Sequence, residues 1–572
     1  MAKTPLFREL MRALQTTREA RRLGVPALEL HELRAEQRLD RRRFLQASAA
    51  AVAVPILARC GSTGTAVGDT SDASGGGGAR VAIVGGGMAG LHCAWRLHKL
   101  GIASTIYEAS SRTGGRMFTD RATFPDGMHC ELGGELIDTG HETMHDLAKE
   151  LSIELLDYTK DDATLEHLVA HFGGVKLTMQ QILDGFAPIA AKMDEALATL
   201  PDQEDLFVYY NKPNGGEALD ALSIKAWFDQ VGASGVVRDL LEMAYTIEYG
   251  LDTDVQNVLN MLFLISTDAS DFKEFGDSDE RFHTKDGNDT FTTKLADGLP
   301  AGTIETGATL RRIKPNGDGW TLSFDRDGGA FEVDADHVVI TLPFTRLREV
   351  DIQAELPAAK RKAIDEMGYG TNAKLMVGFT DRVWRAAKSN GSTYTDVGYQ
   401  ASWETSRLQP GKSGIITNFT GGKVGVDAGK GTPEERMAAF LDGFDQVFPG
   451  AKAAGNGKVA RMHWPTHPQT LGSYSCYTVG QYTTITGVEA EPVGTLHFAG
   501  EHTNLDAQGY MEGAALSGAI AADEVAAALG VATGALISEG LVAAVDARIL
   551  HRAAATRRFR RWKLARRILA QR

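Results

Sequence analysis

The sequence predicts an α/β protein organised around a Rossmann-type, dinucleotide-binding domain, and three features of one stretch support this prediction. Residues 81–84, Val-Ala-Ile-Val, form a short apolar run that is typical of a buried β-strand. Residues 91–100 show helix-like periodicity, and residues 102–107 read as a second strand. A glycine-rich turn separates the first strand from the helix, as in the first βαβ unit of dinucleotide-binding domains.

Three glycines in this turn have the G-x-G-x-x-G spacing of a pyrophosphate-binding loop. Gly85 permits the tight turn, Gly87 lets the backbone approach a pyrophosphate, and Gly90 lets the helix pack against the strand. The free N–H groups at the helix start would then meet the phosphate charge. Glu108 ends the second strand, 18 residues after Gly90, where an acid can accept hydrogen bonds from a ribose diol.

A second glycine-rich turn follows and indicates which dinucleotide is bound. Residues 109–117 read Ala-Ser-Ser-Arg-Thr-Gly-Gly-Arg-Met, so Gly115 and Arg116 end a turn that can wrap the same pyrophosphate and neutralise it. This E-x(5)-GGR element resembles the flavin-containing amine oxidase family, in which it binds FAD. The resemblance spans roughly residues 80–527, and its further motifs are Glu131–Gly134, Lys285–Leu299, Val338–Pro343 and His497–Ala514.

The resemblance implies a Rossmann-type FAD-binding domain interleaved with an α+β substrate-binding domain. The expected FAD-binding segments are 80–145, 281–345 and 489–530, and the expected substrate-domain segments are 146–280 and 346–488. The implied cofactor-binding residues are Gly85, Gly87, Gly90, Glu108, Gly115, Arg116, Leu310, Gly500, Glu501 and Met511. Leu310 stands at the edge where the family's backbone holds adenine, so its side chain need only be apolar.

The resemblance also implies a reaction. Members of the family oxidise a primary or secondary amine to an imine, which hydrolyses to an aldehyde, and O2 reoxidises FAD and yields hydrogen peroxide. The sequence holds no second strand-linked G-x-G-x-x-G for a nicotinamide, which favours an oxidase over an NAD(P)H-linked reductase. Two other functions stay open. One is an L-amino-acid oxidase that forms a 2-oxo acid, ammonia and hydrogen peroxide. The other is an exported flavin-binding protein that acts through partner or membrane association.

Three residues are implied to act at the reacting centre. Lys374 interrupts the apolar face of the strand-like run 371–379, where burying a lysine is costly unless it has a partner. The family's lysine holds a water against the flavin, and a surface-facing Lys374 is the alternative. Tyr474 and Tyr510 align with the two walls of the aromatic cage of monoamine oxidases, where a cation–π contact could attract the amine. The alternative is two ordinary buried tyrosines, and Trp464 is expected at the substrate pocket or packed beneath it.

Departures from the family patterns refine these expectations. Ser473 stands where the animal monoamine oxidases carry the cysteine that bonds the flavin, and serine cannot form that thioether. We therefore expect non-covalent FAD, although Cys476 lies three residues further on. Leu136 stands where many L-amino-acid oxidases carry an arginine that clamps the substrate carboxylate, which favours a simple amine here. Glu135, if it faces the substrate pocket, could attract a cationic diamine.

Other polar residues receive structural interpretations. Glu248 and Tyr249 end the apolar helical stretch 240–249, where core packing is preferred over pocket lining. Residues 141–145 match the H-E-x-x-H zinc motif. Because this run follows the flavin-type turn Gly133-Gly134, we expect a solvated helix start and no metal site.

Length and composition limit the classes of protein to which the chain can belong. The chain has 572 residues, of which 43% are hydrophobic and 23% charged, as expected for a large folded protein with two domains. The net charge of −14 gives no indication of a nucleic-acid partner. Four cysteines without a C-x-x-C pair exclude a disulfide scaffold. The body of the chain holds no apolar run of the roughly 18 residues that a spanning helix needs.

Residues 1–60 are expected to form an export signal region, followed by a Gly/Ser linker at 61–79. Residues 41–46, Arg-Arg-Arg-Phe-Leu-Gln, resemble the twin-arginine signal, which engages the twin-arginine translocation machinery and carries folded proteins to the periplasm or another extracytoplasmic space. A basic surface helix is the alternative. Cys60 resembles a lipoprotein cleavage site apart from Arg59, so lipid anchoring and simple cleavage both stay open.

Residues 535–572 form a basic amphipathic tail. From His551 onward it carries nine Lys or Arg residues and no acidic residue, with aromatic and aliphatic residues interleaved. This pattern suits peripheral contact with an anionic membrane or binding to a partner protein. A solvated terminal helix packed on the body is the alternative.

Overall fold

The computed structural model describes residues 79–531, apart from residues 163, 204–205, 269–272 and 277. These residues belong to one compact unit of the chain, Gly78–Ala553. The expected export region (1–60), all but the last residue of the linker (61–79) and the basic tail (535–572) lie outside the described residues. The twin-arginine-like run and Cys60 therefore lie outside them as well.

A five-stranded parallel sheet carries the first βαβ unit, as the Rossmann prediction requires. Its strand order is β20-β13-β1-β2-β9, and each neighbouring pair is parallel. The strands are β1 (Val81–Val84), β2 (Ser104–Tyr107), β9 (Ile304–Glu305), β13 (His337–Ile340) and β20 (Leu496–Phe498). All four residues of β1 are buried between β13 and β2, which explains their continuous apolar character. The strand predicted at 81–84 is confirmed, and the second strand begins at Ser104 instead of Ile102.

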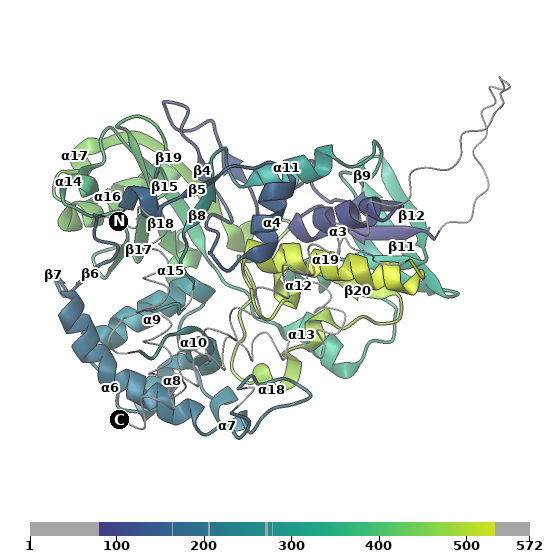
Figure 1. Cartoon of the computed structure of the whole chain (residues 1–572), viewed down its shortest axis with the longest axis horizontal. Coiled ribbons are helices and arrows are strands. Elements are labelled where there is room, and N and C mark those ends of the chain that lie inside the picture. Colours follow the sequence, from purple (N-terminus) through teal and green to yellow (C-terminus); the bar gives the residue numbers. More distant parts are fainter. Residues whose placement is uncertain (1–78, 163, 204–205, 269–272, 277, 532–572) are drawn as a thin grey trace, which may run out of the picture. The chain divides into compact units, whose positions relative to one another are not determined.

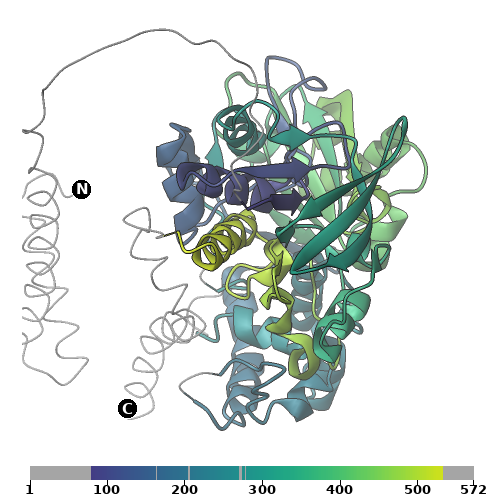
Figure 2. The ribbon, with the colours of Figure 1, turned by 90° about the vertical axis from the view of Figure 1, so that its right-hand side faces the viewer.

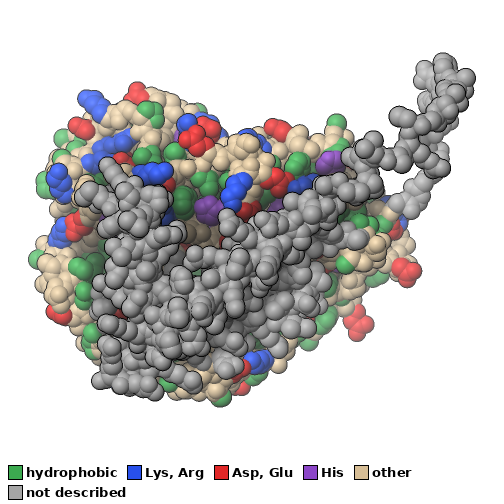
Figure 3. Space-filling view, in the orientation of Figure 1, with side chains coloured by type: hydrophobic (Ala, Val, Ile, Leu, Met, Phe, Trp, Pro, Cys, Tyr) green, Lys and Arg blue, Asp and Glu red, His purple; other side chains and the backbone are tan. Residues whose placement is uncertain are grey.

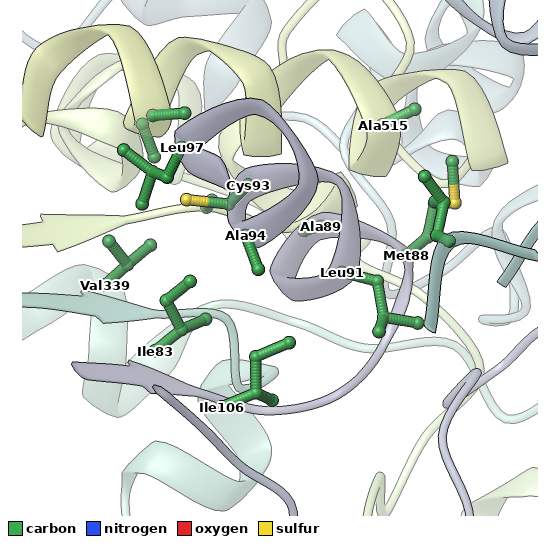
Figure 4. Packing of buried hydrophobic residues seen from close by; sticks show 14 of the residues in the cluster. Ile83, Met88, Ala89, Leu91, Cys93, Ala94, Leu97, Ile106, Val339 and Ala515 are labelled. Atoms are coloured by element: carbon green, nitrogen blue, oxygen red, sulfur yellow. The ribbon is translucent and has the colours of Figure 1, made fainter. Parts of the chain in front are cut away.

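Two helices distant in sequence pack together beside this sheet. The helix α3 (Met88–Lys99) contacts α19 (Met511–Ala528), and the two lie side by side in both ribbon views (Figures 1 and 2). A β-carbon on Gly518 would meet Ala89 O at 2.2 Å, so glycine permits this close contact. Figure 4 shows α3 between α19 and the strands that carry Ile83, Ile106 and Val339. This packing fixes the start of α3, and hence the glycine turn before it.

A second sheet adjoins the end of β2. Its order is β12-β11-β10-β14, with β14 parallel to β10 and the other pairs antiparallel. The strands are β10 (Thr309–Asn316), β11 (Gly319–Arg326), β12 (Gly329–Ala335) and β14 (Asp351–Ile352). Just before β10, Ala308 N donates to Glu108 O at 2.8 Å, which joins this sheet to the end of β2.

A seven-stranded mixed sheet lies in the segments expected to bind substrate. Its order is β19-β15-β18-β17-β16-β6-β7, and only the β16/β6 pair is parallel. The strands are β6 (Val169–Phe172), β7 (Val175–Lys176), β15 (Ala373–Phe379), β16 (Thr393–Thr395), β17 (Ala401–Glu404), β18 (Gly414–Thr420) and β19 (Gly455–His463). Every residue of β15 is buried, including Lys374. The sheets draw strands alternately from different parts of the chain, which gives the interleaved α/β architecture that the sequence predicts.

The remaining elements connect and cover these sheets. Two small antiparallel pairs are β3 (Thr119–Asp120) with β4 (Cys130–Glu131), and β5 (Leu155–Asp157) with β8 (Phe282–Thr284). The other helices are α4 (Glu142–Glu150), α5 (Thr159–Asp162), α6 (Met179–Leu197), α7 (Glu217–Asp220), α8 (Ile224–Gln230), α9 (Val236–Tyr249), α10 (Val258–Leu264), α11 (Asp289–Asp297), α12 (Phe344–Leu347), α13 (Ala358–Glu366), α14 (Val383–Ala386), α15 (Gly422–Asp427), α16 (Pro433–Val447), α17 (Ala451–Ala454) and α18 (Tyr482–Ile485). Short 3-10 turns are η1 (Trp464–Thr466), η2 (Val488–Ala490) and η3 (Glu501–Thr503).

The described part of the face shown in Figure 3 carries charges of both signs. Figure 3 shows Lys and Arg side chains interspersed with Asp and Glu over the described part of the visible face. Among the described helices, none is both long and apolar enough to cross a membrane. The described cysteines Cys93, Cys130 and Cys476 are buried free thiols.

Candidate functional site

The turn between β1 and α3 has the geometry that its glycines predict. Gly85 has φ of +108°, and a β-carbon there would meet Thr341 Oγ1 at 2.4 Å. A β-carbon on Gly90 would meet Gly85 O at 2.0 Å, so Gly90 allows α3 to pack onto the turn. Among the described residues, no side chain caps α3 and no acidic residue lies in its first turn. The N–H groups at this helix start are therefore available to an anion.

The second glycine-rich turn lies directly against the first. Gly114 N donates to Gly86 O at 2.8 Å, and Gly114 also forms a parallel β-bridge with Gly87. A β-carbon on Gly115 would lie 3.3 Å from Gly87 Cα. Both turns therefore present backbone at one place, beside the start of α3, where a pyrophosphate was predicted.

Glu108 lies at the end of β2 and is buried. Its Oε2 accepts a hydrogen bond from Gly86 N at 2.7 Å, and its Oε1 accepts from Ser110 N and Ser110 Oγ, each at 2.8 Å. The carboxylate that was predicted to bind a ribose therefore also holds the first glycine turn. Leu310 lies in β10, two residues after the backbone bond between Ala308 and Glu108, and its side chain is buried as expected for an apolar edge.

Arg116 joins the second glycine turn to the C-terminal motif. Its guanidinium donates to Glu501 Oε1 at 2.8 Å and to Ser473 O at 2.7 Å. Glu501 follows Gly500 and also accepts from Ser475 Oγ at 2.7 Å and from Gly509 N at 2.9 Å. Burial is the largest single effect and would raise the pKa of Glu501, but the Arg116 charge, His502 and the hydrogen bonds from Ser475 and Arg116 together lower it, which favours the ion pair.

The turn Glu131–Gly134 packs against Arg116 and Met511. A β-carbon on Gly133 would meet Arg116 O at 1.8 Å, and one on Gly134 would meet Met511 Cγ at 2.8 Å. Trp464 is buried behind the same turn and donates its indole N–H to Leu132 O at 3.2 Å. The structure therefore places Trp464 beneath the Glu131–Gly134 turn.

Lys374 points inward from β15 and is paired. Its Nζ lies 2.7 Å from Glu135 Oε2 and 2.8 Å from Gly133 O, and both charged side chains are buried. Glu135 Oε1 accepts from the Trp403 indole N–H at 2.8 Å and from the Thr405 hydroxyl. Burial is the largest single effect and favours the neutral acid, but the Lys374 charge and the hydrogen bonds from Lys374 and Thr405 together lower the pKa of Glu135. The charge of Glu135 is thus neutralised within the protein, which removes the basis for the expectation that it attracts a diamine.

The two predicted cage tyrosines are held by the last turn of one helix. Tyr474 donates its hydroxyl to Ile247 O at 3.1 Å, and Tyr510 donates to Glu248 Oε1 at 2.9 Å. Both rings are half-buried, and Gly509 lies against the Tyr474 ring. Ile247 and Glu248 are consecutive residues of α9, so one helix end fixes both hydroxyls.

Two acidic residues lie near the tyrosines, and sequence reasoning named one of them, Glu248, but not the other, Glu280. The core-packing interpretation preferred for Glu248 is incomplete, because its carboxylate contacts Tyr510. Burial is the largest cause that raises the pKa of Glu248 to about 7, and the Tyr510 hydrogen bond opposes it. Glu280 was not identified from the sequence at all. Its φ of +43° is unusual for glutamate, but this conformation leaves no pattern in the sequence.

The H-E-x-x-H run has a different role from the expected solvated helix start. His141 is buried, and its Nδ1 accepts from Asp138 N at 3.0 Å. His145 Nε2 lies 3.0 Å from Asp138 O. Both rings are thus engaged with Asp138, and the solvated helix start is wrong for His141 because the preceding turn covers it.

A different group brings three potential metal ligands together. Within the described residues, His129, Glu131 and His283 place one ligand atom each within 4.8 Å of one another, all buried. Glu131 Oε1 already lies 3.1 Å from His283 Nε2 and accepts from Asn288 N at 2.9 Å. We interpret Glu131, His283 and Asn288 as a hydrogen-bond network that holds the Glu131–Gly134 turn, while the His129 ring stacks on His283 with centroids 5.8 Å apart.

Ser473 and Cys476 occupy different surroundings. Ser473 is buried, and its hydroxyl donates to Asn372 Oδ1 at 2.6 Å. Cys476 is fully buried next to Asn260, and burial raises the pKa of its thiol well above the ordinary value. A neutral, enclosed thiol is a poor nucleophile, which gives no support to a thioether at Cys476.

Comparisons with known proteins agree with this geometry. A family model described as flavin containing amine oxidoreductase matches residues 88–526. Lysine-specific histone demethylase 1 homolog 1 from Oryza sativa subsp. japonica is 28% identical over 466 residues, which cover 77% of this chain and 51% of that protein. Polyamine oxidase 4 from the same plant is 24% identical over 459 residues, which cover 78% of this chain and 88% of that protein.

A solved structure shows the same fold. Cyclohexylamine oxidase from Brevibacterium oxydans IH-35A has a TM-score of 0.69 and 20% sequence identity, and the match covers 79% of this chain and 100% of that one. At this identity the likeness bears on the fold alone, and it confirms the fold class predicted from the sequence.

Proposed function

Because this chain belongs to the flavin containing amine oxidoreductase family, we propose that it oxidises a primary or secondary amine to an imine, with O2 as electron acceptor and hydrogen peroxide as product. Its cofactor is FAD. The imine hydrolyses in water to an aldehyde and ammonia or a smaller amine. The activity is that of an FAD-dependent amine oxidase.

The residues on the cofactor side fit FAD. The paired glycine turns and the uncapped start of α3 form an anion-binding cradle, and Glu108 lies at its edge. Arg116 adds a positive charge that Glu501 holds in place. When bound, FAD would accept a hydride, which is two electrons and one proton, from the substrate carbon, and two electrons and two protons would then convert O2 to hydrogen peroxide.

The protein's own part in the reaction is orientation and charge placement. The Tyr474 and Tyr510 rings hold the amine nitrogen, and α9 fixes both rings through their hydroxyls. Lys374 keeps a positive charge beside the Gly133 carbonyl, where its field favours the reaction of the reduced flavin with oxygen. Glu135 balances that charge, so the pair adds no net charge to the site.

The anchoring of both tyrosines on α9 is the observation that supports an amine substrate best. It holds two electron-rich rings in fixed orientations, and such rings attract an ammonium group through cation–π interactions. The test is anaerobic mixing of the FAD-loaded protein with a panel of amines, polyamines and amino acids, while the visible flavin absorbance is recorded. Bleaching by amines supports the proposal, and a flavin that no amine bleaches overturns it.

An L-amino-acid oxidase would need a carboxylate clamp. Leu136 cannot supply one, and the nearby Arg407 is already engaged. Its guanidinium stacks on the Tyr158 ring at 3.9 Å, and its Nε donates to Glu404 O at 3.1 Å. An amine is therefore favoured over an amino acid as the substrate. Bleaching of the flavin by amino acids alone would reverse this preference.

The terminal segments support proposals about location. The twin-arginine-like run at 41–46 favours export of the FAD-loaded protein by the twin-arginine route, with Cys60 as a candidate lipid anchor. The basic tail from 535 onward favours peripheral contact with an anionic membrane. Replacing Arg41–Arg43 by lysines should leave the protein in the cytoplasm, which fractionation would detect. Vesicles containing anionic lipid should bind the full chain but not a chain that ends at residue 534.

A further inference from the structure

The carboxyl end of helix α9 meets the buried side chain of Asn372. The last four carbonyl groups of an α-helix lack partners within the helix, and Ile247 O belongs to this last turn of α9. Asn372 Nδ2 donates to Ile247 O at 2.7 Å, and the Asn372 side chain is fully buried. Asn372 therefore caps α9 from a segment that lies 125 positions away in the sequence.

The other half of the same amide holds the segment that carries Tyr474. Asn372 Oδ1 accepts from the Ser473 hydroxyl at 2.6 Å, and Ser473 directly precedes Tyr474. The Tyr474 hydroxyl donates to Ile247 O at 3.1 Å, so the tyrosine and the amide share one carbonyl. A carbonyl oxygen has two lone pairs, and the two donors satisfy both of them.

This junction connects all three residues that were predicted at the reacting centre. Lys374 lies two residues after Asn372, on strand β15. The Tyr510 hydroxyl donates to Glu248, which follows Ile247 on α9. The strand that carries the lysine and the helix end that holds both tyrosines are therefore joined through one amide side chain.

Glycines allow close packing around this amide. A β-carbon on Gly250 would lie 2.0 Å from Asn372 Oδ1, and one on Gly370 would lie 2.5 Å from Ser473 Oγ. A side chain at either glycine would displace the hydrogen-bonded groups. Because the Ile247 carbonyl can only accept, the NH2 group of Asn372 must face it, which fixes the orientation of the amide.

We propose that Asn372 is a positioning residue that holds Tyr474 and Tyr510 at fixed distances from Lys374. This inference rests on the proposed amine oxidation, because it assigns a support to that site. Without the amide, Ile247 O loses a donor and the end of α9 is free to shift, together with the tyrosine hydroxyls bound to it. A misplacement of about 1 Å at a reacting centre can cost about 10²-fold in rate.

The test measures flavin reduction in the FAD-loaded full chain. Octylamine, cyclohexylamine and 1,4-diaminobutane are mixed with it anaerobically, and the dissociation constant and the limiting rate of flavin reduction are determined for each amine that bleaches the flavin. In Asn372→Ala the ratio of limiting rate to dissociation constant should fall by about 10- to 100-fold.

A matched control separates positioning from loss of a buried amide. Asn257 is also fully buried, donates to Asp220 O at 2.9 Å and accepts from Leu259 N at 2.9 Å. Asn257→Ala should lower the free energy of unfolding but keep the wild-type ratio. If Asn372→Ala does not fold, Ser473→Ala removes the other bond of the Asn372 amide, and the ratio should fall by about 3- to 10-fold.

A double-mutant cycle tests whether Asn372 acts through Tyr474. When Tyr474→Ala has already removed the ring, the further loss caused by Asn372→Ala or Ser473→Ala should be at least about threefold smaller than in the wild type. A residue that only stabilised the fold would cause equal losses in both backgrounds. Equal losses, or an unchanged ratio in the variant that folds, overturn the inference while amine oxidation stands. A wild-type flavin that none of the three amines reduces overturns the proposed function itself.

Discussion

Lys374 Nζ lies 2.7 Å from Glu135 Oε2 inside the protein, and this ion pair joins strand β15 to the turn that ends at Gly134. The pair is satisfied on both sides, because Lys374 also donates to Gly133 O and Glu135 accepts from Trp403 and Thr405. A buried charge with this many partners costs little while the set is complete and much when one member is removed.

Lys374→Met should therefore destabilise the protein through Glu135. Removing one partner of a buried pair costs about 3–5 kcal/mol, and urea unfolding would measure this loss. The double variant Lys374→Met with Glu135→Leu should recover most of the stability because no unpaired charge remains. A double variant as unstable as the single one would show that packing, and not charge, controls this position.

Lys374→Met should also affect the two half-reactions, flavin reduction and flavin reoxidation, to different degrees. Anaerobic flavin reduction by an amine should change little, whereas reoxidation by O2 should slow by about 10²-fold, as for loss of one electrostatic contact at a reacting centre. Stopped-flow absorbance measures both rates. Glu135→Gln retains the lysine and serves as the control. Equal slowing of both half-reactions would contradict a role of Lys374 toward oxygen.

Removing the Tyr474 ring should weaken amine binding. Tyr474→Ala should raise the dissociation constant for amines by about 30-fold, which corresponds to roughly 2 kcal/mol for a desolvated cation–π contact. Tyr474→Phe retains the ring and loses only the bond to Ile247 O, so its effect should be much smaller. Equal effects of the two substitutions would assign the role to the hydroxyl.

Glu248 should make both stability and amine binding depend on pH. The folded protein holds this carboxyl proton up to a pKa of about 7, above the ordinary value of 4.5. The contribution of Glu248 to the free energy of unfolding is therefore fully present below pH 4.5. It is lost as pH rises through 7, which lowers the free energy of unfolding by up to about 3 kcal/mol. Urea unfolding at several pH values should show this loss in the wild type relative to Glu248→Gln.

Amine binding should respond in the opposite direction. Ionised Glu248 attracts an ammonium group and orients Tyr510, so the dissociation constant should fall as pH rises through 7, and Glu248→Gln should lack this change. Glu489 is the matched control, because burial also raises its pKa to about 7 but it contacts Tyr477 instead. Glu489→Gln should keep the pH dependence of binding. If Glu489→Gln abolished the pH dependence of amine binding, that dependence could not be assigned to Glu248.

Glu108→Ala should weaken FAD binding by about 10- to 100-fold, since it removes a charged acceptor worth about 1.5–3 kcal/mol. Titration of the apoprotein with FAD, followed by flavin fluorescence, measures the change. The control is Glu305, which lies at the end of the neighbouring strand β9 and pairs with Arg326 on the surface. Glu305→Gln should bind FAD as tightly as the wild type does. If Glu108→Ala bound FAD as tightly as the wild type, Glu108 would serve only to hold Gly86 and not to bind the cofactor.

The flavin should not be covalently attached. Ser473 cannot form a thioether, and the Cys476 thiol is buried and neutral. Denaturation with trichloroacetic acid should therefore release all yellow colour into the supernatant. Colour that stays with the precipitated protein, and moves with a tryptic peptide containing Cys476, would show a bond at that cysteine.

The sequence determined those features that depend on spacing along the chain. The glycines at 85, 87 and 90, the strand at 81–84 and the acid at 108 lie close together in sequence, so local backbone geometry alone relates them. The family motifs also predicted the interleaved α/β fold and an inward Lys374. Helix and strand ends were less exact, because packing against α19 and the neighbouring strands decides where α3 and β2 begin.

Only the tertiary structure decided which side chains meet across the chain. Lys374 and Glu135 are 239 positions apart, and Tyr510 and Glu248 are 262 positions apart. Whether Glu135 offers its charge to a substrate depends on the lysine that the fold brings to it. The conformation of Glu280 likewise depends on Asp138, 142 positions away. These pairings arise from the crossing of separate sheets and helices, and no periodicity or local spacing encodes them.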